Sequence, residues 1–267
     1  MKIFRKMYAI FFVFLIFSGC VSNPLSGKNT MAFIGNDELF AMSFSEYSTF
    51  LNENKVITGT ADAEMIKRVG IRLADAAQKW LVSEGQPHYL DDYKWEYNLV
   101  QDDQINAWCM PGGKIVFYTG ILPITRDETG VAIVMGHEIA HALLNHGQQR
   151  MSASVLQQLG AVGIAVLTGG SSPTTQALAM AAYGIGSNYA GMLPFSRDNE
   201  NEADEYGLYL MAIAGYDPDQ AAPLWERMAA LGSSGPEWLS THPSSENRIK
   251  HLRELSPKAK EVAARLR

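Results

Sequence analysis

Apolar residues recur at helical spacing along much of the chain, and this pattern predicts that most of the protein is helical. Residues 65–80 carry the clearest apolar stripe, and residues 36–54 carry a weaker one. Residues 131–144 are apolar almost throughout, which is typical of a helix buried inside a core. The members of the clearest stripe are Met65, Ile66, Val69, Leu73, Ala76, Ala77 and Trp80.

Polar residues at the ends of these runs predict where the helices begin and end. Residues 125–128 have the form of a capping box, with Thr125 as the N-cap of the apolar helix that follows. Ser196 is the expected N-cap of a later helix, which Gly215 is expected to end. Asp217-Pro218 is expected to open a further helix.

An alternating pattern before the apolar helix predicts a small sheet. In residues 94–101, Trp95, Tyr97 and Leu99 share one face of a half-buried strand. Two more strands are expected at 105–109 and 114–119, around a glycine-containing turn. The chain is therefore expected to have an α+β fold class, mostly helical, with one small sheet.

Residues 150–192 stand apart because they are rich in alanine and glycine. They are expected to form two small-residue helices that pack tightly against the core, and neither half is expected to span a bilayer. The flanking glycines support a second hypothesis, in which this region is a mobile lid or plug over a cleft.

The candidate chemistry lies on the apolar helix, where residues 137–141 read H-E-x-x-H. Residues four apart share a helical face, so His137 and His141 can bind one metal ion together. Glu138 is close enough to reach a metal-bound water as a general base. Such side chains are costly to bury unless they are paired or ligate a metal. The motif therefore points to zinc-dependent peptide hydrolysis rather than to a surface helix with two chance histidines.

A hydrolytic zinc site needs a third protein ligand and an open position for water. The extended metzincin pattern is excluded, because Leu144 and Gly147 stand where it requires glycine and histidine. A better candidate is the acidic segment at 198–204, in which Glu200 and Asp204 lie one helical turn apart on the same face.

These segments together resemble the gluzincin metallopeptidase family that includes HtpX, the CAAX prenyl endopeptidases and Oma. Within that family the chain is most similar to bacterial periplasmic lipoprotein proteases of the LoiP and BepA kind, without the repeat extension of BepA. The resemblance implies a zincin-like metalloprotease domain. Other matching segments are N-A-W at 106–108, P-G-G-K-I at 111–115, A-G-Y-D-P at 214–218, T-H-P at 241–243 and N-R-I at 247–249.

The resemblance also assigns roles to residues of this chain. It implies one zinc ion (Zn2+) per chain, bound by His137, His141 and Glu200, with Glu138 as the catalytic base. Asp204 is expected either to fix the tautomer of a ligand histidine or to act as a catalytic proton donor.

Two further residues have more than one interpretation. His242 matches a histidine that in some relatives becomes a regulatory fourth zinc ligand, but a histidine before proline can also cap a turn. Arg248 is expected to stabilise an oxyanion, to pair with Asp204, or to lie exposed on a short C-terminal helix.

The family resemblance also suggests how substrate would bind. It places the strand at 115–119 at the edge of the sheet beside the zinc helix. An edge strand can pair with an extended peptide through main-chain hydrogen bonds, which would favour unfolded substrates. The alternative is a hairpin with a purely structural role.

The N-terminus has the pattern of a secretory signal, with basic residues before an apolar run that is too short to span a membrane. Gly19-Cys20 resembles the end of a bacterial lipobox, so residues 1–19 are expected to be a lipoprotein signal peptide and Cys20 the lipidation site. The alternative is an ordinary signal with an incidental cysteine. In enterobacterial lipoproteins an aspartate directly after the lipidated cysteine retains the protein at the inner membrane. This chain has Val21 there, which favours the periplasmic side of the outer membrane.

Removal of the signal peptide defines the expected mature protein. Residues 20–35 are expected to be a flexible tether, and residues 36–267 a single metallopeptidase domain. Losing Lys2, Arg5 and Lys6 changes the net charge from −6 to −9. The sequence contains no basic patch that would indicate a nucleic-acid partner. The other cysteine, Cys109, lies in a predicted strand and is expected to be a buried thiol.

Two functions from different classes follow. The first is a zinc endopeptidase that cleaves unfolded or misassembled envelope proteins as quality control. The second is an anchored, chaperone-like lipoprotein that binds clients while its zinc site is latent or self-inhibited. The expected partners are such proteins, the membrane through the N-terminal lipid, and either envelope assembly machinery or a regulatory protease.

Overall fold

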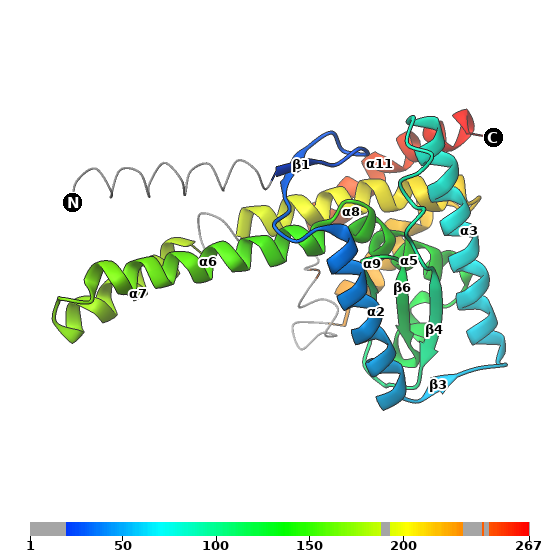
Figure 1. The fold of residues 1–267 in the computed structure, drawn as a ribbon. Helices are drawn as coiled ribbons and strands as arrows, with labels where there is room; N and C mark the ends of the chain where they lie inside the picture. Colours follow the sequence, from blue (N-terminus) through cyan, green and yellow to red (C-terminus); the bar gives the residue numbers. More distant parts are fainter. Residues whose placement is uncertain (1–19, 188–192, 232–241, 243–245, 267) are drawn as a thin grey trace. The chain divides into compact units, whose positions relative to one another are not determined.

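The computed structural model describes residues 20–187, 193–231, 242 and 246–266. These residues form two compact units. The first joins the N-terminal segment up to Leu39 to Asn145–Arg197, and the second joins Phe40–Leu144 to the chain from Asp198 onward. The fold is mostly helical with a small mixed sheet in the second unit, which confirms the predicted fold class (Figure 1).

The second unit contains a four-stranded sheet with the order β3-β4-β6-β5. Strands β4 and β6 are parallel, and the other neighbours are antiparallel. Strand β6 therefore lies inside the sheet and β5 at its edge, so the prediction that 115–119 is the edge strand is wrong. The reason is the parallel partner β4, which the hairpin pattern does not reveal. The strands are β3 (Val56–Ile57), β4 (Glu96–Val100), β5 (Ala107–Met110) and β6 (Lys114–Tyr118).

Helices cover both faces of this sheet. On one face, α3 (Ala61–Ser83) and α5 (Glu128–Leu143) pack against each other, α3 against β4 and α5 against β5. On the other face, Tyr47 of α2 (Asn36–Glu53) packs against Val116 of β6 and its neighbours. Helix α5 is thus enclosed, and every residue from Gly130 to Leu143 is buried.

The start of α5 differs from the prediction. Asp127 is its N-cap, and the Asp127 side chain accepts a hydrogen bond of 2.9 Å from the N–H of Gly130. Thr125, predicted as the N-cap, is instead the last residue of a separate short helix, α4 (Leu122–Thr125). Pro123 at the start of α4 favours that earlier turn, so the next carboxylate along the chain becomes the cap.

The remaining helices of the second unit carry the other candidate site residues. Helix α8 begins before Ser196, so that predicted N-cap is wrong, while Gly215 at φ +88° follows its last turn as predicted. Asp217 opens the next helical segment as predicted, by accepting from the N–H of Asp219. The bounds are η1 (Thr119–Ile121), α8 (Leu193–Ile213), η3 (Pro218–Gln220), α9 (Ala221–Ala229) and α11 (Glu246–Arg265).

The first unit begins with an antiparallel hairpin of β1 (Cys20–Ser22) and β2 (Asn29–Met31). This hairpin lies in the segment predicted as a flexible tether. The sequence signal that the prediction missed is Asn23, whose side chain accepts from the N–H groups of Leu25 and Ser26 and so stabilises the turn. The predicted single domain over 36–267 stays a prediction.

Two helices, α6 (His146–Thr168) and α7 (Pro173–Ser187), pack against each other in the first unit, and α6 also contacts β2. They confirm that the Ala- and Gly-rich region forms two helices. No described side chain of α6 beyond Ser152 is buried, so the prediction of tight packing against a core is wrong for this helix. Within the described residues, one helix, α6, is long and apolar enough to cross a membrane by length and composition alone. That neither half of this region spans a bilayer stays a prediction.

Candidate metal centre

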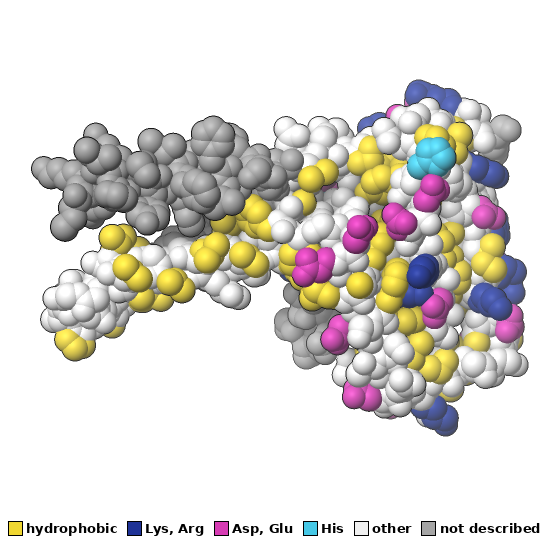
Figure 2. Space-filling view, viewed as in Figure 1, with side chains coloured by type: hydrophobic (Ala, Val, Ile, Leu, Met, Phe, Trp, Pro, Cys, Tyr) yellow, Lys and Arg dark blue, Asp and Glu magenta, His cyan; other side chains and the backbone are white. Residues whose placement is uncertain are grey.

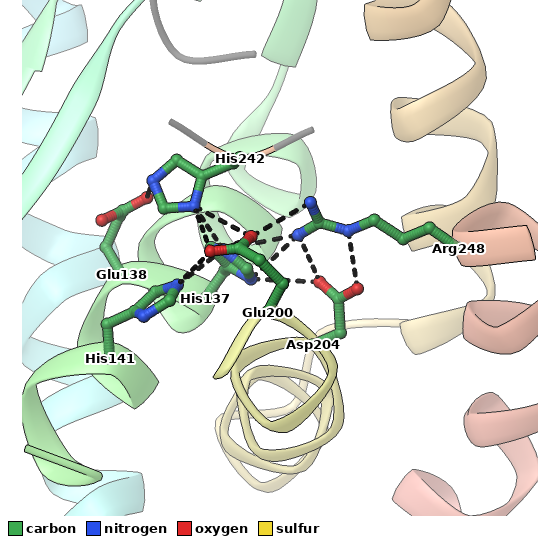
Figure 3. A network of polar contacts seen from close by, with 7 residues as sticks. All are labelled: His137, Glu138, His141, Glu200, Asp204, His242 and Arg248. Carbon is green, nitrogen blue, oxygen red and sulfur yellow. Dashed lines mark hydrogen bonds and ion pairs between the residues drawn. The ribbon is translucent and has the colours of Figure 1, made fainter. Parts of the chain in front are cut away.

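Four side chains with metal-binding atoms meet inside the second unit (Figure 3). His137 and His141 come from α5, Glu200 comes from α8, and His242 follows α9. One ligand atom from each of the four lies within 4.8 Å of the others, and all four residues are buried. The structure therefore brings together residues that are more than a hundred positions apart in the chain.

A close approach of two helix backbones positions this cluster. A Cβ atom added at Gly207 of α8 would lie 2.8 Å from the backbone nitrogen of His137, and one added at Gly136 would lie 2.9 Å from the carbonyl oxygen of Gly207. Only glycine fits at such a contact. Glu200 lies two helical turns before Gly207 on the same face of α8, so this contact holds the carboxylate beside the two histidines.

The distances among the four side chains fit a zinc ion. The Nε2 atom of His137 lies 3.1 Å from Nε2 of His141 and 3.1 Å from Nδ1 of His242. The oxygens of Glu200 lie 3.4 Å from His137 and 3.3 Å from His141. Nitrogen and oxygen ligands about 2.1 Å from a tetrahedral zinc ion would be separated by about 3.4 Å. The donor set and its spacing therefore suit a divalent metal ion such as zinc.

Glu138 is buried on the other side of His242 (Figure 3). Its Oε1 atom lies 3.5 Å from Nε2 of His242, while Nδ1 of the same imidazole lies 3.0 Å from both oxygens of Glu200. The imidazole of His242 thus stands between the candidate base, Glu138, and the carboxylate of Glu200.

Arg248 and Asp204 form a second layer behind the ligands. Arg248 donates to both oxygens of Asp204 at 2.7 Å, and its Nη1 lies 3.1 Å from Glu200. Asp204 in turn lies 3.0 Å from Nδ1 of His137. Of the three alternatives for Arg248, the structure shows pairing with Asp204, and the exposed alternative is wrong because the side chain is buried.

One contributor was missed by the sequence analysis. The guanidinium carbon of Arg248 lies 3.4 Å from the ring centroid of Trp225 in α9, a cation–π contact. Trp225 belongs to an apolar stripe of a short helix, and such a stripe indicates a core position without indicating a charged neighbour.

The protonation preferences of the histidines differ. Burial opposes a charge on His137, but the carboxylates of Asp204 and Glu200 outweigh it and raise its pKa to about 9. For His141 and His242 burial prevails, and it lowers their pKa to about 3 and about 4. The latter two histidines are therefore neutral at neutral pH, which is the form that ligates metal.

The two carboxylates are held in their charged form. Burial would raise the pKa of Asp204, but Arg248 and His137 bring it below its ordinary value. Burial likewise opposes charge on Glu200, and its hydrogen bonds to the histidines lower its pKa far more. Both carboxylates are therefore anionic and suited to balance the charge of a divalent cation.

The structure thus groups all seven residues that the sequence analysis nominated for the site, from His137 to Arg248. Cys20, the candidate lipidation site, belongs to the first unit. Cys109 lies in β5 as predicted, but its side chain is only partly buried rather than fully buried as expected, and desolvation raises the pKa of its thiol above the ordinary value.

Two histidines and an adjacent glutamate on one helix, with a carboxylate ligand from a second helix, define a zinc-metallopeptidase type of site. The model of peptidase family M48 matches residues 64–256, and the chain belongs to this family.

Curated relatives agree with this family. The mitochondrial metalloendopeptidase OMA1 of Schizosaccharomyces pombe is 38% identical over 64% of this chain and 49% of its own length. The mitochondrial metalloendopeptidase OMA1 of Homo sapiens is 30% identical over 96% of this chain and 49% of its own length. The beta-barrel assembly-enhancing protease of Escherichia coli is 31% identical over 60% of this chain and 34% of its own length. The chain spans about half the length of these two OMA1 proteins and about a third of the Escherichia coli protein.

Proposed function

We propose that the protein is a zinc-dependent endopeptidase that cleaves unfolded or misassembled proteins of the bacterial cell envelope. The observation that carries this proposal is the placement of Glu138 beside the buried cluster of His137, His141 and Glu200. That arrangement supplies the three protein ligands and the base that peptide hydrolysis requires.

Each residue of the site then has a task. Zinc bound by the three ligands would polarise the scissile carbonyl and lower the pKa of water. Glu138 takes the proton from the attacking water and passes it to the leaving nitrogen. Asp204, held by Arg248, accepts from Nδ1 of His137, so Nε2 is the atom that would give up its proton to bind the metal ion.

The edge strand offers a way to bind substrate. Strand β5 lies at the edge of the sheet and packs against α5, the helix that carries the candidate base. An extended peptide that pairs with β5 would be held through main-chain hydrogen bonds. This mode accepts many sequences but requires an unfolded segment, which supports the proposed substrate class.

The proposed location rests on the N-terminal pattern and on one relative. Cys20 follows a secretory signal pattern, and the Escherichia coli relative is named as a beta-barrel assembly-enhancing protease. We therefore infer a lipid anchor at Cys20 on the periplasmic side of the outer membrane. The partners inferred from this location are envelope assembly machinery or a regulatory protease.

The position of His242 favours a second function, client binding without cleavage, while its imidazole blocks the site. Its imidazole stands between Glu138 and Glu200, at 3.5 Å and 3.0 Å, in the space that an attacking water needs. In this arrangement His242 restrains hydrolysis as a fourth ligand, and the protein would bind clients without cutting them until the imidazole moves away.

Cleavage of casein tests the proposal directly. The wild type would be compared with Glu138→Gln and His242→Ala, with zinc content measured for each. We expect cleavage by the wild type, a loss of at least about 100-fold in Glu138→Gln at full zinc occupancy, and faster cleavage by His242→Ala. Casein binding without cleavage in every zinc-loaded form would replace the endopeptidase by the client-binding function.

A further inference from the structure

The hairpin of α6 and α7 exposes apolar side chains that the proposed peptidase chemistry does not use. Val166 and Leu167 are 76% and 73% exposed, and Leu178 on α7 is 67% exposed. Single exposed apolar residues are common, but a row of them along one element marks an interaction surface. The full set is Val155, Leu159, Val162, Val166, Leu167, Leu178 and Met180.

The same segment carries no charge. No Lys, Arg, Asp or Glu lies between Arg150 and Arg197, a stretch of 46 residues in a chain that is 19% charged. Figure 2 shows α6 and α7 in yellow and white, without charged side chains on the visible face. A protein-binding surface is rimmed by polar and charged residues, whereas lipid hydrocarbon excludes charge. The composition therefore favours lipid as the occupant.

Polar groups at the turn between α6 and α7 are bonded within the turn. The Ser172 hydroxyl accepts from the N–H of Thr175 at 3.2 Å, and the Gln176 side chain donates to the carbonyl of Ser171 at 3.0 Å. The Thr168 hydroxyl donates to a carbonyl one turn earlier at 2.8 Å. Inside a bilayer, polar groups without water must find such internal partners. The side chains of Thr168, Ser172 and Gln176 at the tip of the hairpin already have such partners.

The helix lengths indicate how the hairpin would enter a bilayer. The 23 residues of α6 extend about 35 Å and the 15 residues of α7 about 23 Å. A hydrocarbon layer is about 30 Å thick, so α7 is too short to cross it. A hairpin with these two arms reaches into one leaflet and returns to the same side.

The base of the hairpin is tied to the chain that follows Cys20. The Gln148 side chain donates to the carbonyl of Ile34 at 2.7 Å, and the N–H of Phe33 donates to the Ser152 hydroxyl at 3.1 Å. A lipid on Cys20 would thus hold at the membrane the same compact unit that carries the apolar hairpin.

We propose that the α6–α7 hairpin inserts its exposed apolar side chains and its tip into one leaflet of a phospholipid bilayer. This contact depends neither on zinc nor on peptidase activity. It gives the first unit an attachment to the membrane besides the N-terminus.

A fluorescent label at Leu167→Cys tests this in the full chain. Cys109 is partly exposed, so it would be replaced by alanine in both labelled proteins, and an environment-sensitive thiol dye would then react at the introduced cysteine once Cys20 is lipidated or replaced by serine. The matched control is Val82→Cys, at an exposed apolar position of α3 that is 51% accessible. Both proteins would be reconstituted with phosphatidylcholine vesicles, whose net charge is zero, so that electrostatic attraction contributes nothing.

We expect nitroxide-labelled lipids to quench the dye at Leu167→Cys and not at Val82→Cys, with iodide quenching at Leu167→Cys reduced about fivefold by vesicles. Adding Val166→Glu and Leu178→Glu is expected to abolish both effects, because each glutamate opposes insertion. Equal iodide quenching at the two sites would overturn the proposal. So would shielding that is already complete before vesicles are added, since it would identify a second copy of the chain as the occupant.

Discussion

The close contact between Gly136 of α5 and Gly207 of α8 leads us to predict that a larger residue at position 207 weakens zinc binding. Alanine at position 207 would place its Cβ 2.8 Å from the backbone nitrogen of His137, where ordinary contacts begin at 3.4 Å. The helices must therefore separate by at least about 0.6 Å, which exceeds the tolerance of about 0.2 Å for a zinc–ligand distance. We expect Gly207→Ala to weaken zinc binding by about 10- to 100-fold.

The same substitution is expected to lower the free energy of unfolding. Overpacking a rigid contact typically costs about 1–3 kcal/mol, and here the obstacle is backbone, which cannot rotate away. Gly163→Ala in α6 is the matched control, because a Cβ there meets nothing within 4 Å. Since alanine is the better helix former, Gly163→Ala is expected to stabilise the protein by up to about 1 kcal/mol.

Zinc affinity would be measured by competition with a chromogenic chelator, and stability by urea denaturation of each metal-free protein. The comparison separates the steric effect from the general effect of replacing glycine in a helix. If Gly207→Ala binds zinc as tightly as the wild type and is as stable, the close approach of α5 and α8 does not position the ligands, and the reasoning fails.

Three further predictions follow from buried side chains. Removing the metal with a chelator is expected to lower the melting temperature, since zinc binds only the folded site; an unchanged temperature after confirmed removal would contradict the assigned ligands. Arg248→Met is expected to cost up to about 3–5 kcal/mol in urea denaturation, because the buried carboxylate of Asp204 loses its two hydrogen bonds to the guanidinium and keeps only His137 as an ion-pair partner. Asp204→Asn in the same chain should recover part of that loss, and no recovery would argue against the pair. Ile66→Ala in the core is expected to lower the free energy of unfolding by about 2–5 kcal/mol. Ile71→Ala, at a position 47% exposed on the same helix, should change it by less than about 1 kcal/mol. Equal losses in the two variants would contradict the described burial.

Periodicity was sufficient to predict the helices because the stripe on α3 and the apolar run of α5 are local features of the chain. The ligands on α5 could be named because their spacing of four is fixed by the helix itself. The acidic segment with Glu200 and Asp204 was a candidate from its own spacing. The family resemblance chose Glu200 as the third ligand and added His242 and Arg248, whose proximity to the histidines no local pattern determines.

Non-local pairing limited the rest of the prediction. Strand β6 pairs with β4 in parallel, so it is not an edge strand. The residues of a strand do not determine which other strand pairs with it, so this pairing could not be predicted. Local patterns do not reveal the cap at Asp127, because Thr125, the expected N-cap, is the last residue of the separate helix α4. The cation–π contact of Trp225 with Arg248 depends on the packing of α9 against α11, which only the tertiary structure shows.

The order of the two units along the chain has a further consequence. Asn145–Arg197 is an insertion within the second unit, and it begins four residues after His141 and ends three before Glu200. A zinc ion bound by both His141 and Glu200 would cross-link the two ends of this insertion and so close it into a loop. The entropy of such a loop changes slowly, by about 0.6 kcal/mol for each doubling of length. The insertion is therefore a place where a hydrolase of this architecture can exchange, lengthen or shorten its accessory segment while the metal site keeps its geometry.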